Sequence, residues 1–345
     1  MKAAILHGGG DLRYESAPDP APGPGEVVVK VHACSICGSD LHAFHGQHPR
    51  LTFPRILGHE FAGEIVALGK DIGNFRAGQR VCCDIDLPCG ACGPCREGRS
   101  NICERLRTMG FDRDGAYAEY ALVPDFNLHL LPADVSFDQA SAVQVLGIGY
   151  HAVADRVKPQ AGERIAVIGA GPVGLGAALI AQSKGAEVAI LDVLDYRLAM
   201  ARKLGIATTV DPKCGELRER ALELTGGRGF DKVIECVGGF QERTVADAIG
   251  IIKRGGQITI VGTFPGNQAT IPIAFLKDRE IDINFSRGNF RAFAPCLDLI
   301  ASGKINPDLY ISHRLPLTSA AEALRLLEAR NVEAHKIVLH PQAGA

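Results

Sequence analysis

The chain has 345 residues, about twice the length of a typical domain, so we expect two domains. Its 37 lysines and arginines nearly balance its 39 aspartates and glutamates, and the net charge of −2 argues against nucleic-acid or anionic-membrane partners. The longest apolar stretch, residues 165–181, is broken by four glycines and a proline, so we expect no membrane span. No secretory signal is recognisable, and eleven cysteines then favour reduced thiols, metal ligands and a cytoplasmic location over a disulfide framework.

The first part of the chain predicts short strands separated by turns. Apolar runs at residues 1–6, 26–32 and 61–69 are bounded by segments rich in glycine and proline. This pattern indicates a β-rich domain with many loops.

The pattern changes after about residue 150. Short apolar strands now alternate with helix candidates, which indicates a doubly wound parallel sheet covered by helices on both faces. The expected strands are residues 165–168, 188–191, 232–234 and 258–261, and the expected helices include residues 175–184, 197–204 and 320–330. A last strand is expected at residues 336–339.

A glycine-rich turn follows the first of these buried strands and opens the next helix. It has the pattern G-x-G-x-x-G at Gly169, Gly171 and Gly174. In this context the glycines allow a tight turn, backbone approach to a pyrophosphate and close packing of the helix on the sheet. Asp192 ends the second strand, where a carboxylate accepts hydrogen bonds from the ribose diol of NAD and repels the 2′-phosphate of NADP.

The turn therefore predicts a site for NAD rather than NADP. Arg197 is the residue that leaves NADP open, although a side chain at this position can equally flank the adenine. The residues expected to bind the coenzyme are Gly169, Gly171, Pro172, Val173, Gly174, Asp192 and Arg197.

Four cysteines lie within one short loop. Cys89, Cys92, Cys95 and Cys103 have the spacing C-x2-C-x2-C-x7-C, which is typical of a closed, structural zinc site. A ferredoxin cluster shares the first three spacings, but it would need an earlier fourth cysteine and a proline where Glu104 stands. Disulfides are the remaining alternative.

Two further motifs supply a thiol, an imidazole and a carboxylate. They are C-G-S-D-x-H at residues 37–42 and G-H-E-x-x-G at residues 58–63. Together with the four-cysteine loop and the glycine-rich turn, they make the chain resemble the medium-chain zinc-dependent alcohol dehydrogenases. Within that superfamily it is most similar to the polyol, sugar-acid and threonine dehydrogenase branch.

The resemblance implies a fold, a set of cofactors and an assembly. A β-rich, GroES-like catalytic domain would comprise residues 1–150, with residues 287–345 returning to it, and a Rossmann NAD-binding domain would comprise residues 151–286. The cofactors would be NAD and two zinc ions per chain, one catalytic and one structural. The family likeness also implies a homo-oligomer, either a dimer or a tetramer.

The resemblance also implies roles for single residues. Cys37 and His59 would bind the catalytic zinc, and Glu60 would be a third ligand or lie close behind it. Ser39 and His42 would relay the substrate proton through the nicotinamide ribose to solvent. The reaction would be NAD-dependent oxidation of a secondary alcohol to a ketone, with a polyol, a sugar acid or a cyclitol as substrate. The alternatives are a threonine or small-diol dehydrogenase, and a catalytically silent NAD-binding relative.

Gln144 departs from the family pattern. The family usually has a cysteine, glutamate or aspartate at this place. Either the metal site is degraded, or Gln144 serves as a neutral zinc ligand or as a hydrogen-bond partner of the water on the zinc. The intact set of Cys37, His59 and Glu60 argues against a degraded site.

A charge count at this site gives a testable prediction. Thiolate Cys37 and carboxylate Glu60 balance the zinc dication, whereas an added glutamate would leave the site negative by one. Because a less negative site lowers the pKa of a bound alcohol further, Gln144→Glu should move the pH–rate profile upward. An unchanged profile in a variant that still holds zinc would contradict this account.

Overall fold

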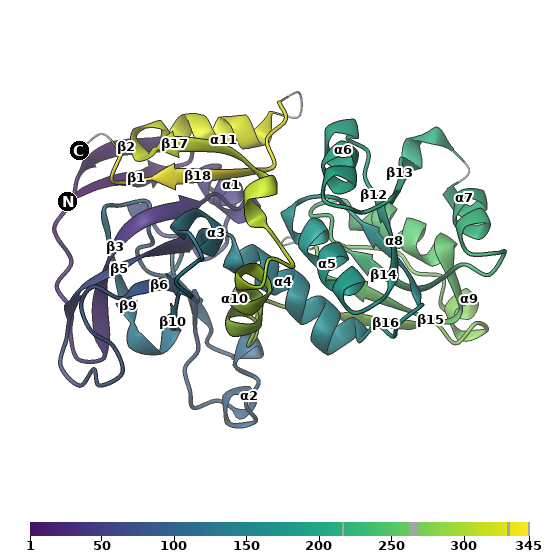
Figure 1. Ribbon diagram of the computed structural model, residues 1–345, viewed down its shortest axis with the longest axis horizontal. Coiled ribbons are helices and arrows are strands. Elements are labelled where there is room, and N and C mark those ends of the chain that lie inside the picture. The colour runs from purple at the N-terminus through teal and green to yellow at the C-terminus, as the bar shows by residue number, and fades with distance from the viewer. Residues whose placement is uncertain (216, 263–267, 330–331, 344–345) are drawn as a thin grey trace. The chain divides into compact units, whose positions relative to one another are not determined.

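The computed structural model describes residues 1–215, 217–262, 268–329 and 332–343 (Figure 1). The chain forms two compact units. The first consists of residues 1–144 and 293–345, and the second of residues 145–292. No helix in the described ranges combines the length and the apolar character needed to cross a membrane.

The first unit is built on a mostly antiparallel sheet. Its described strands lie in the order β10-β6-β5-β3-β18-β17, and β9 also pairs with β3. Their bounds are β3 (Glu26–Ser35), β5 (Glu60–Leu68), β6 (Arg80–Cys83), β9 (Tyr120–Pro124), β10 (Leu128–Leu130), β17 (Ile311–Pro316) and β18 (Lys336–His340). The central strand β3 is rich in valine, and Val27, Val29 and Val31 are fully buried. Because β18 pairs with β3, residues 336–340 belong to the same sheet as residues 26–35.

Smaller elements surround this sheet. A three-stranded sheet has the order β2-β1-β4, and β7 pairs with β8. These strands are β1 (Lys2–Gly8), β2 (Asp11–Ser16), β4 (Arg55–Ile56), β7 (Asp86–Leu87) and β8 (Arg107–Thr108). The helices are α1 (Gly38–Phe44), α2 (Gly93–Arg96), α3 (Phe137–Ser141), α10 (Phe293–Ala301) and α11 (Ala320–Glu328), with short turns of 3₁₀ helix at Ser100–Ile102, Asp125–Asn127, Pro307–Leu309 and Leu317–Ser319.

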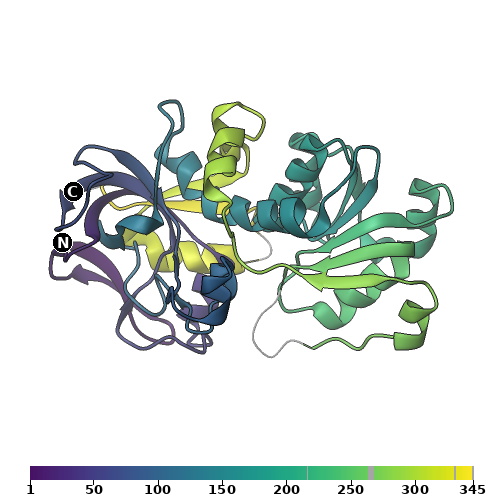
Figure 2. The ribbon, with the colours of Figure 1, turned by 90° about the horizontal axis from the view of Figure 1, so that it is seen from below.

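The second unit is a parallel sheet with helices packed against it (Figures 1 and 2). The strand order is β13-β12-β11-β14-β15-β16, and every neighbouring pair is parallel. The strands are β11 (Arg164–Ile168), β12 (Glu187–Leu191), β13 (Thr208–Val210), β14 (Phe230–Glu235), β15 (Ile252–Ile260) and β16 (Asp282–Phe285). The helices are α4 (Val143–His151), continued by a π-helical segment at Ala152–Val157, α5 (Pro172–Ser183), α6 (Asp195–Lys203), α7 (Leu217–Leu224), α8 (Gln241–Ile251) and α9 (Ile273–Lys277), with a 3₁₀ turn at Pro212–Cys214.

This arrangement confirms the expected fold class. Numbered along the unit, the strands run 3-2-1-4-5-6, the order of a doubly wound dinucleotide-binding sheet. The last four of the five residues of β11, Ile165 to Ile168, are buried, as expected for a strand covered on both faces. The order reverses between β11 and β14, and ligands of such sheets bind beside the carboxyl ends of the strands at this point.

Some elements differ from the expectation. The strand expected at residues 258–261 is only the second half of β15, which begins at Ile252. Its first half contains Lys253, Arg254 and two glycines, and its pairing with β14 is irregular there, so no apolar pattern marks it. The edge strands β13 and β16, with three and four residues, were too short to be recognised by periodicity.

Candidate active site and metal centres

Strand pairing in the first unit brings the two catalytic motifs together. Ser35 at the end of β3 lies opposite Glu60 at the start of β5. Cys37 follows β3 by two residues, and His59 directly precedes β5. The ligand atoms of Cys37, His59 and Glu60 all lie within 4.8 Å of one another. His59 and Glu60 are buried, and Cys37 is partly exposed.

A carboxylate behind this cluster orients the imidazole. Asp40, fully buried in α1, has its Oδ1 atom 3.2 Å from Nδ1 of His59. Its Oδ2 atom accepts hydrogen bonds from the backbone N–H of Cys37 and from the hydroxyl of Tyr117, each at 3.0 Å. A carboxylate on Nδ1 leaves Nε2 of the ring to face a metal, as in many metal-bound histidines.

Electrostatics couple these two groups. Burial opposes the charged form of His59, but the Asp40 carboxylate outweighs it and holds the histidine pKa well above its usual value. Burial likewise opposes ionisation of Asp40, and the charge of His59 outweighs it and lowers the pKa of that carboxyl. Sequence reasoning missed Asp40 as a functional residue, although it stands three residues after Cys37 in the same motif.

Glu60 is paired with a second buried charge. The ammonium group of Lys336, the first residue of β18, forms an ion pair with the Glu60 carboxylate and donates a hydrogen bond to the carbonyl of Ile36 at 3.1 Å. Both side chains are almost entirely buried. Lys336 was expected only as the start of a strand, so its place beside Glu60 is a second residue that sequence reasoning missed.

Of the remaining catalytic candidates, Ser39 lies beside this cluster. The Oγ atom of Ser39 lies 3.4 Å from Nε2 of His59. His42 lies one turn further along α1, where its Nδ1 atom is 3.2 Å from Oε1 of Gln47. Gln144 is buried, and its side-chain oxygen accepts no hydrogen bond from any residue that the structure describes.

This donor set fits zinc. A thiol, an imidazole and a carboxylate within reach of one another are the ligand types that zinc takes in catalytic sites. An unsatisfied buried amide oxygen is unfavourable by about 1–3 kcal/mol, so the orphaned oxygen of Gln144 is itself evidence of a missing partner.

The four-cysteine loop forms a second cluster. The sulfur atoms of Cys89, Cys92, Cys95 and Cys103 lie within 4.8 Å of one another. Backbone N–H groups of Cys89 and Arg105 lie 3.3 and 3.4 Å from the Cys103 sulfur, and backbone hydrogen bonding, chiefly from Ala91, lowers the pKa of Cys89 to about 6.

Backbone hydrogen bonds also lower the pKa of Cys92, whereas burial raises the pKa of Cys95 to about 12, so the loop favours the thiolate form, which binds zinc, at Cys89 and Cys92. The cysteines whose side chains the structure describes are all free thiols, so the disulfide alternative finds no support among them.

The glycine-rich turn of the second unit is shaped by its glycines. Gly169 has φ of +100°, and a Cβ atom on Gly174 would lie only 1.8 Å from the Gly169 carbonyl oxygen. A Cβ atom on Gly171 would meet nothing within 4 Å, so the backbone there is open to a ligand. Pro172 and Val173 begin helix α5, whose positive end favours negative charge.

Asp192 lies against this turn. Its Oδ2 atom accepts a hydrogen bond from the backbone N–H of Ala170 at 2.8 Å, and its Oδ1 atom accepts one from Leu194 at 2.9 Å. Arg197 lies 3.4 Å from the same carboxylate. The expected coenzyme residues are therefore brought together at the carboxyl ends of β11 and β12.

Comparison with known proteins defines the family. Residues 23–133 match the alcohol dehydrogenase GroES-like domain, and residues 172–302 match the zinc-binding dehydrogenase domain. The chain is 34% identical to L-galactonate-5-dehydrogenase of Escherichia coli K12, over 93% of this chain and 94% of that protein. It is 33% identical to sorbitol dehydrogenase of Bacillus subtilis 168, over 99% and 97%.

Comparison with solved structures supports the same family. A zinc-binding dehydrogenase structure from Sinorhizobium meliloti 1021, bound to NADP, superposes with a TM-score of 0.93 at 32% identity and covers 99% of both chains. The chain therefore belongs to the zinc-dependent alcohol dehydrogenase family, as its motifs predicted, with its relatives in the polyol-like branch. It is an oxidoreductase rather than a silent coenzyme-binding relative.

The buried ion pair gives a stability prediction. Lys336→Met keeps the apolar stem but leaves the Glu60 carboxylate buried without a counter-charge, so unfolding free energy should fall by about 3–5 kcal/mol. Denaturant unfolding at fixed zinc concentration measures this. The double variant Glu60→Gln/Lys336→Met removes both charges and should recover most of the loss. A loss below about 1 kcal/mol in the single variant would contradict the pairing.

Proposed function

We propose that this enzyme oxidises a secondary alcohol of a polyhydroxylated compound, such as a polyol, a sugar acid or a cyclitol, to a ketone, with NAD⁺ as hydride acceptor. The observation that carries the proposal is the convergence of Cys37, His59 and Glu60 in front of the buried Asp40. Sorbitol and L-galactonate are polyhydroxylated, and the enzymes named for them share about a third of this sequence over nearly their full length.

The chain's own residues prepare the site for this chemistry. Cys37 and His59 would hold a zinc ion, with Glu60 or Gln144 as further ligand, and the zinc would supply a Lewis acid that lowers the pKa of the substrate hydroxyl. Asp40 fixes the orientation of the His59 ring. Ser39, beside Nε2 of His59, would take up the hydroxyl proton, and His42 would pass it towards solvent while the hydride leaves for the nicotinamide ring.

Asp192 supports NAD as the coenzyme. It is held by two backbone N–H groups at the carboxyl end of the second strand, where its charge would accept the ribose hydroxyls and repel a 2′-phosphate. Arg197 is already within 3.4 Å of Asp192, so its charge is partly committed to that carboxylate rather than available for a phosphate.

The four-cysteine cluster would hold the second, structural zinc. It brings four sulfur atoms together without a carboxylate or imidazole, and a closed site of this kind adds folding free energy rather than chemistry. Thiolates must stay reduced to bind the metal, which supports the cytoplasm as the place where the enzyme works.

We also propose that the enzyme is a homo-oligomer, either a dimer or a tetramer. Strand β16 is an edge of the parallel sheet, and among the described strands it pairs only with β15. Its Phe285 side chain is 63% exposed, and in the same unit Ile273 of α9 is 65% exposed. An open edge with exposed apolar side chains favours pairing with a second chain.

The proposed function predicts a defined pattern of activity. Zinc-loaded protein with NAD⁺ should form NADH, followed by absorbance, when given at least one member of a panel of polyols, sugar acids and cyclitols. NADP⁺ should support a rate at least tenfold lower because of Asp192, and Cys37→Ala should lose several orders of magnitude of kcat/KM.

Turnover confined to threonine or to small diols in the same panel would replace the substrate class. Faster turnover with NADP⁺ would contradict the role given to Asp192.

A further inference from the structure

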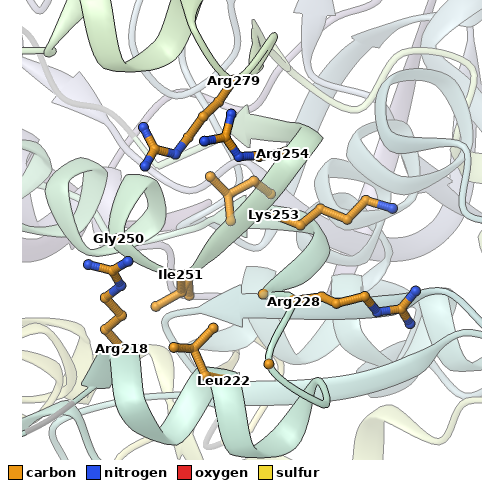
Figure 3. Close-up of a pocket in the computed structure, with 11 residues that line it drawn as sticks. Arg218, Leu222, Arg228, Gly250, Ile251, Lys253, Arg254 and Arg279 are labelled. Carbon is orange, nitrogen blue, oxygen red and sulfur yellow. The ribbon is translucent and has the colours of Figure 1, made fainter.

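A second candidate binding site lies in the second unit. It is at the amino-terminal ends of the strands, whereas the glycine-rich turn is at their carboxyl ends. A cavity of about 460 Å³ opens at the amino-terminal ends of β14 and β15 (Figure 3). The cationic side chains that line it are Arg218, Arg228, Lys253, Arg254 and Arg279. Neither the catalytic motifs nor the coenzyme residues include any of them.

Glycines form part of the lining of this cavity and fix the turn beside it. The turn at residues 226–229 has positive φ at three glycines, and a Cβ atom on Gly229 would lie 2.8 Å from the carbonyl oxygen of Ile251. The backbone N–H of Gly229 donates to the buried hydroxyl of Thr225 at 2.8 Å. The turn that carries Arg228 is therefore fixed against the start of β15, which carries Lys253 and Arg254.

Two of the arginines are held in place by other contacts. Arg254 donates a hydrogen bond to the carbonyl of Asp278 at 3.1 Å. The guanidinium carbon of Arg279 lies 3.6 Å from the centre of the Phe275 ring. Figure 3 shows these two guanidinium groups gathered at one end of the pocket, with Arg218 approaching from α7. Neither contact uses a carboxylate, so neither neutralises the charge.

The positive charge around this cavity is only partly balanced. Asp231 pairs with Lys253 at 2.5 Å. Within the described ranges, neither Arg218 nor Arg228 forms an ion pair with a carboxylate. Arginine stays charged at any physiological pH, so the repulsion cannot be relieved by loss of a proton. With a net charge of only −2 over the whole chain, this excess is a local feature.

We propose that this basic pocket, made of Arg218, Arg228, Lys253, Arg254 and Arg279, binds a small polyphosphate anion: the di- or triphosphate group of a nucleotide, or an inorganic polyphosphate. A guanidinium group can donate two parallel hydrogen bonds to the oxygens of one phosphate. A pocket lined by several guanidinium groups therefore favours a ligand with several negative charges. The volume suits a small ligand. All five cations line a single cavity of small-ligand size, whereas nucleic acids need an extended basic surface.

The pocket is separate from the coenzyme turn. Strand β14 starts at the pocket, and Glu235 at its other end pairs with Ile168, the last residue before Gly169. The six residues of β14 span about 17 Å from first to last, at roughly 3.3 Å per step. A polyphosphate in the pocket would therefore bind together with the coenzyme and not in competition with it.

Calorimetric titration with sodium pyrophosphate tests this proposal. The full-length protein is first freed of unbound metal and saturated with NADH, so that the coenzyme turn is occupied. We expect one saturable pyrophosphate site per chain, with an affinity that falls as salt is raised. Arg218→Gln/Arg228→Gln should weaken binding at least tenfold. Both side chains are exposed, so the variant should keep its thermal unfolding temperature and its affinity for NADH.

Arg220→Gln is the matched control. Arg220 lies on the same helix, α7, but pairs with Glu223 at 2.8 Å and does not line the cavity, so its loss should leave pyrophosphate affinity within twofold. Titration with ADP then separates the two sources, because tighter binding of ADP than of pyrophosphate indicates a nucleotide. Either order supports the proposal.

Three results would overturn it: no binding of pyrophosphate or ADP to NADH-saturated protein, equal affinity in the double variant and the wild type, or preferential binding of a single-stranded oligonucleotide. If NADH itself did not bind, the proposed coenzyme site would fail, and the double variant compared with Arg220→Gln would still decide this proposal.

Discussion

The first unit is organised around a cluster of buried charges. Asp40, His59, Glu60 and Lys336 are each almost completely removed from water, and Cys37 is partly so. A single charge buried in this way is strongly unfavourable unless it is paired and hydrogen-bonded. The pairs Asp40–His59 and Glu60–Lys336 supply the opposite charges, while Oδ1 of Asp40, Nδ1 of His59 and both carboxylate oxygens of Glu60 have no hydrogen-bond partner among the described residues.

The charges also limit what can occupy the site. Asp40 and Lys336 carry opposite charges and cancel in the local count. With a metal bound, the ring of His59 would be neutral, and thiolate Cys37 and carboxylate Glu60 would leave two negative charges that a dication balances. The neutral side chain of Gln144 preserves this balance, so a glutamine is compatible with an intact metal site. Strand pairing brings these charged groups together. Strand β3 pairs with β5, which begins at Glu60, and with β18, which begins at Lys336, and it leads into the segment that carries Cys37 and Asp40.

Local motifs allowed the fold class, the family and the candidate metal and coenzyme residues to be predicted from the sequence. The four cysteines and the glycine-rich turn each lie within a short segment, so spacing alone predicts their chemistry, and the family and fold class were confirmed. Lys336 could not be found in this way, because it reaches the carbonyl of Ile36 across 300 residues of sequence. The basic pocket could not be predicted from the sequence for the same reason, since its charged residues come from four separate segments. Asp40 was visible in its motif, but only the geometry shows that it supports His59.

The coenzyme unit illustrates a second limit. Gly169, Gly174 and Asp192 could be singled out from the sequence because a glycine-rich turn after a buried strand and an acid at the end of the next strand form a short local pattern, and the structure places Asp192 against that turn. The sheet edges could not be singled out, because β13 and β16 are short and the start of β15 is charged and rich in glycine. Strand β16 supplies the exposed edge, and the start of β15 supplies Lys253 and Arg254 to the cavity.

We propose that the buried cluster around Cys37 and His59 binds a zinc ion separate from that of the four-cysteine loop. Elemental analysis of the purified protein by mass spectrometry tests it most directly. We expect two zinc ions per chain in the wild type and one in a folded Cys37→Ala variant, since only the cluster around Cys37 and His59 loses a ligand. One zinc in the wild type, or two in the variant, would contradict it.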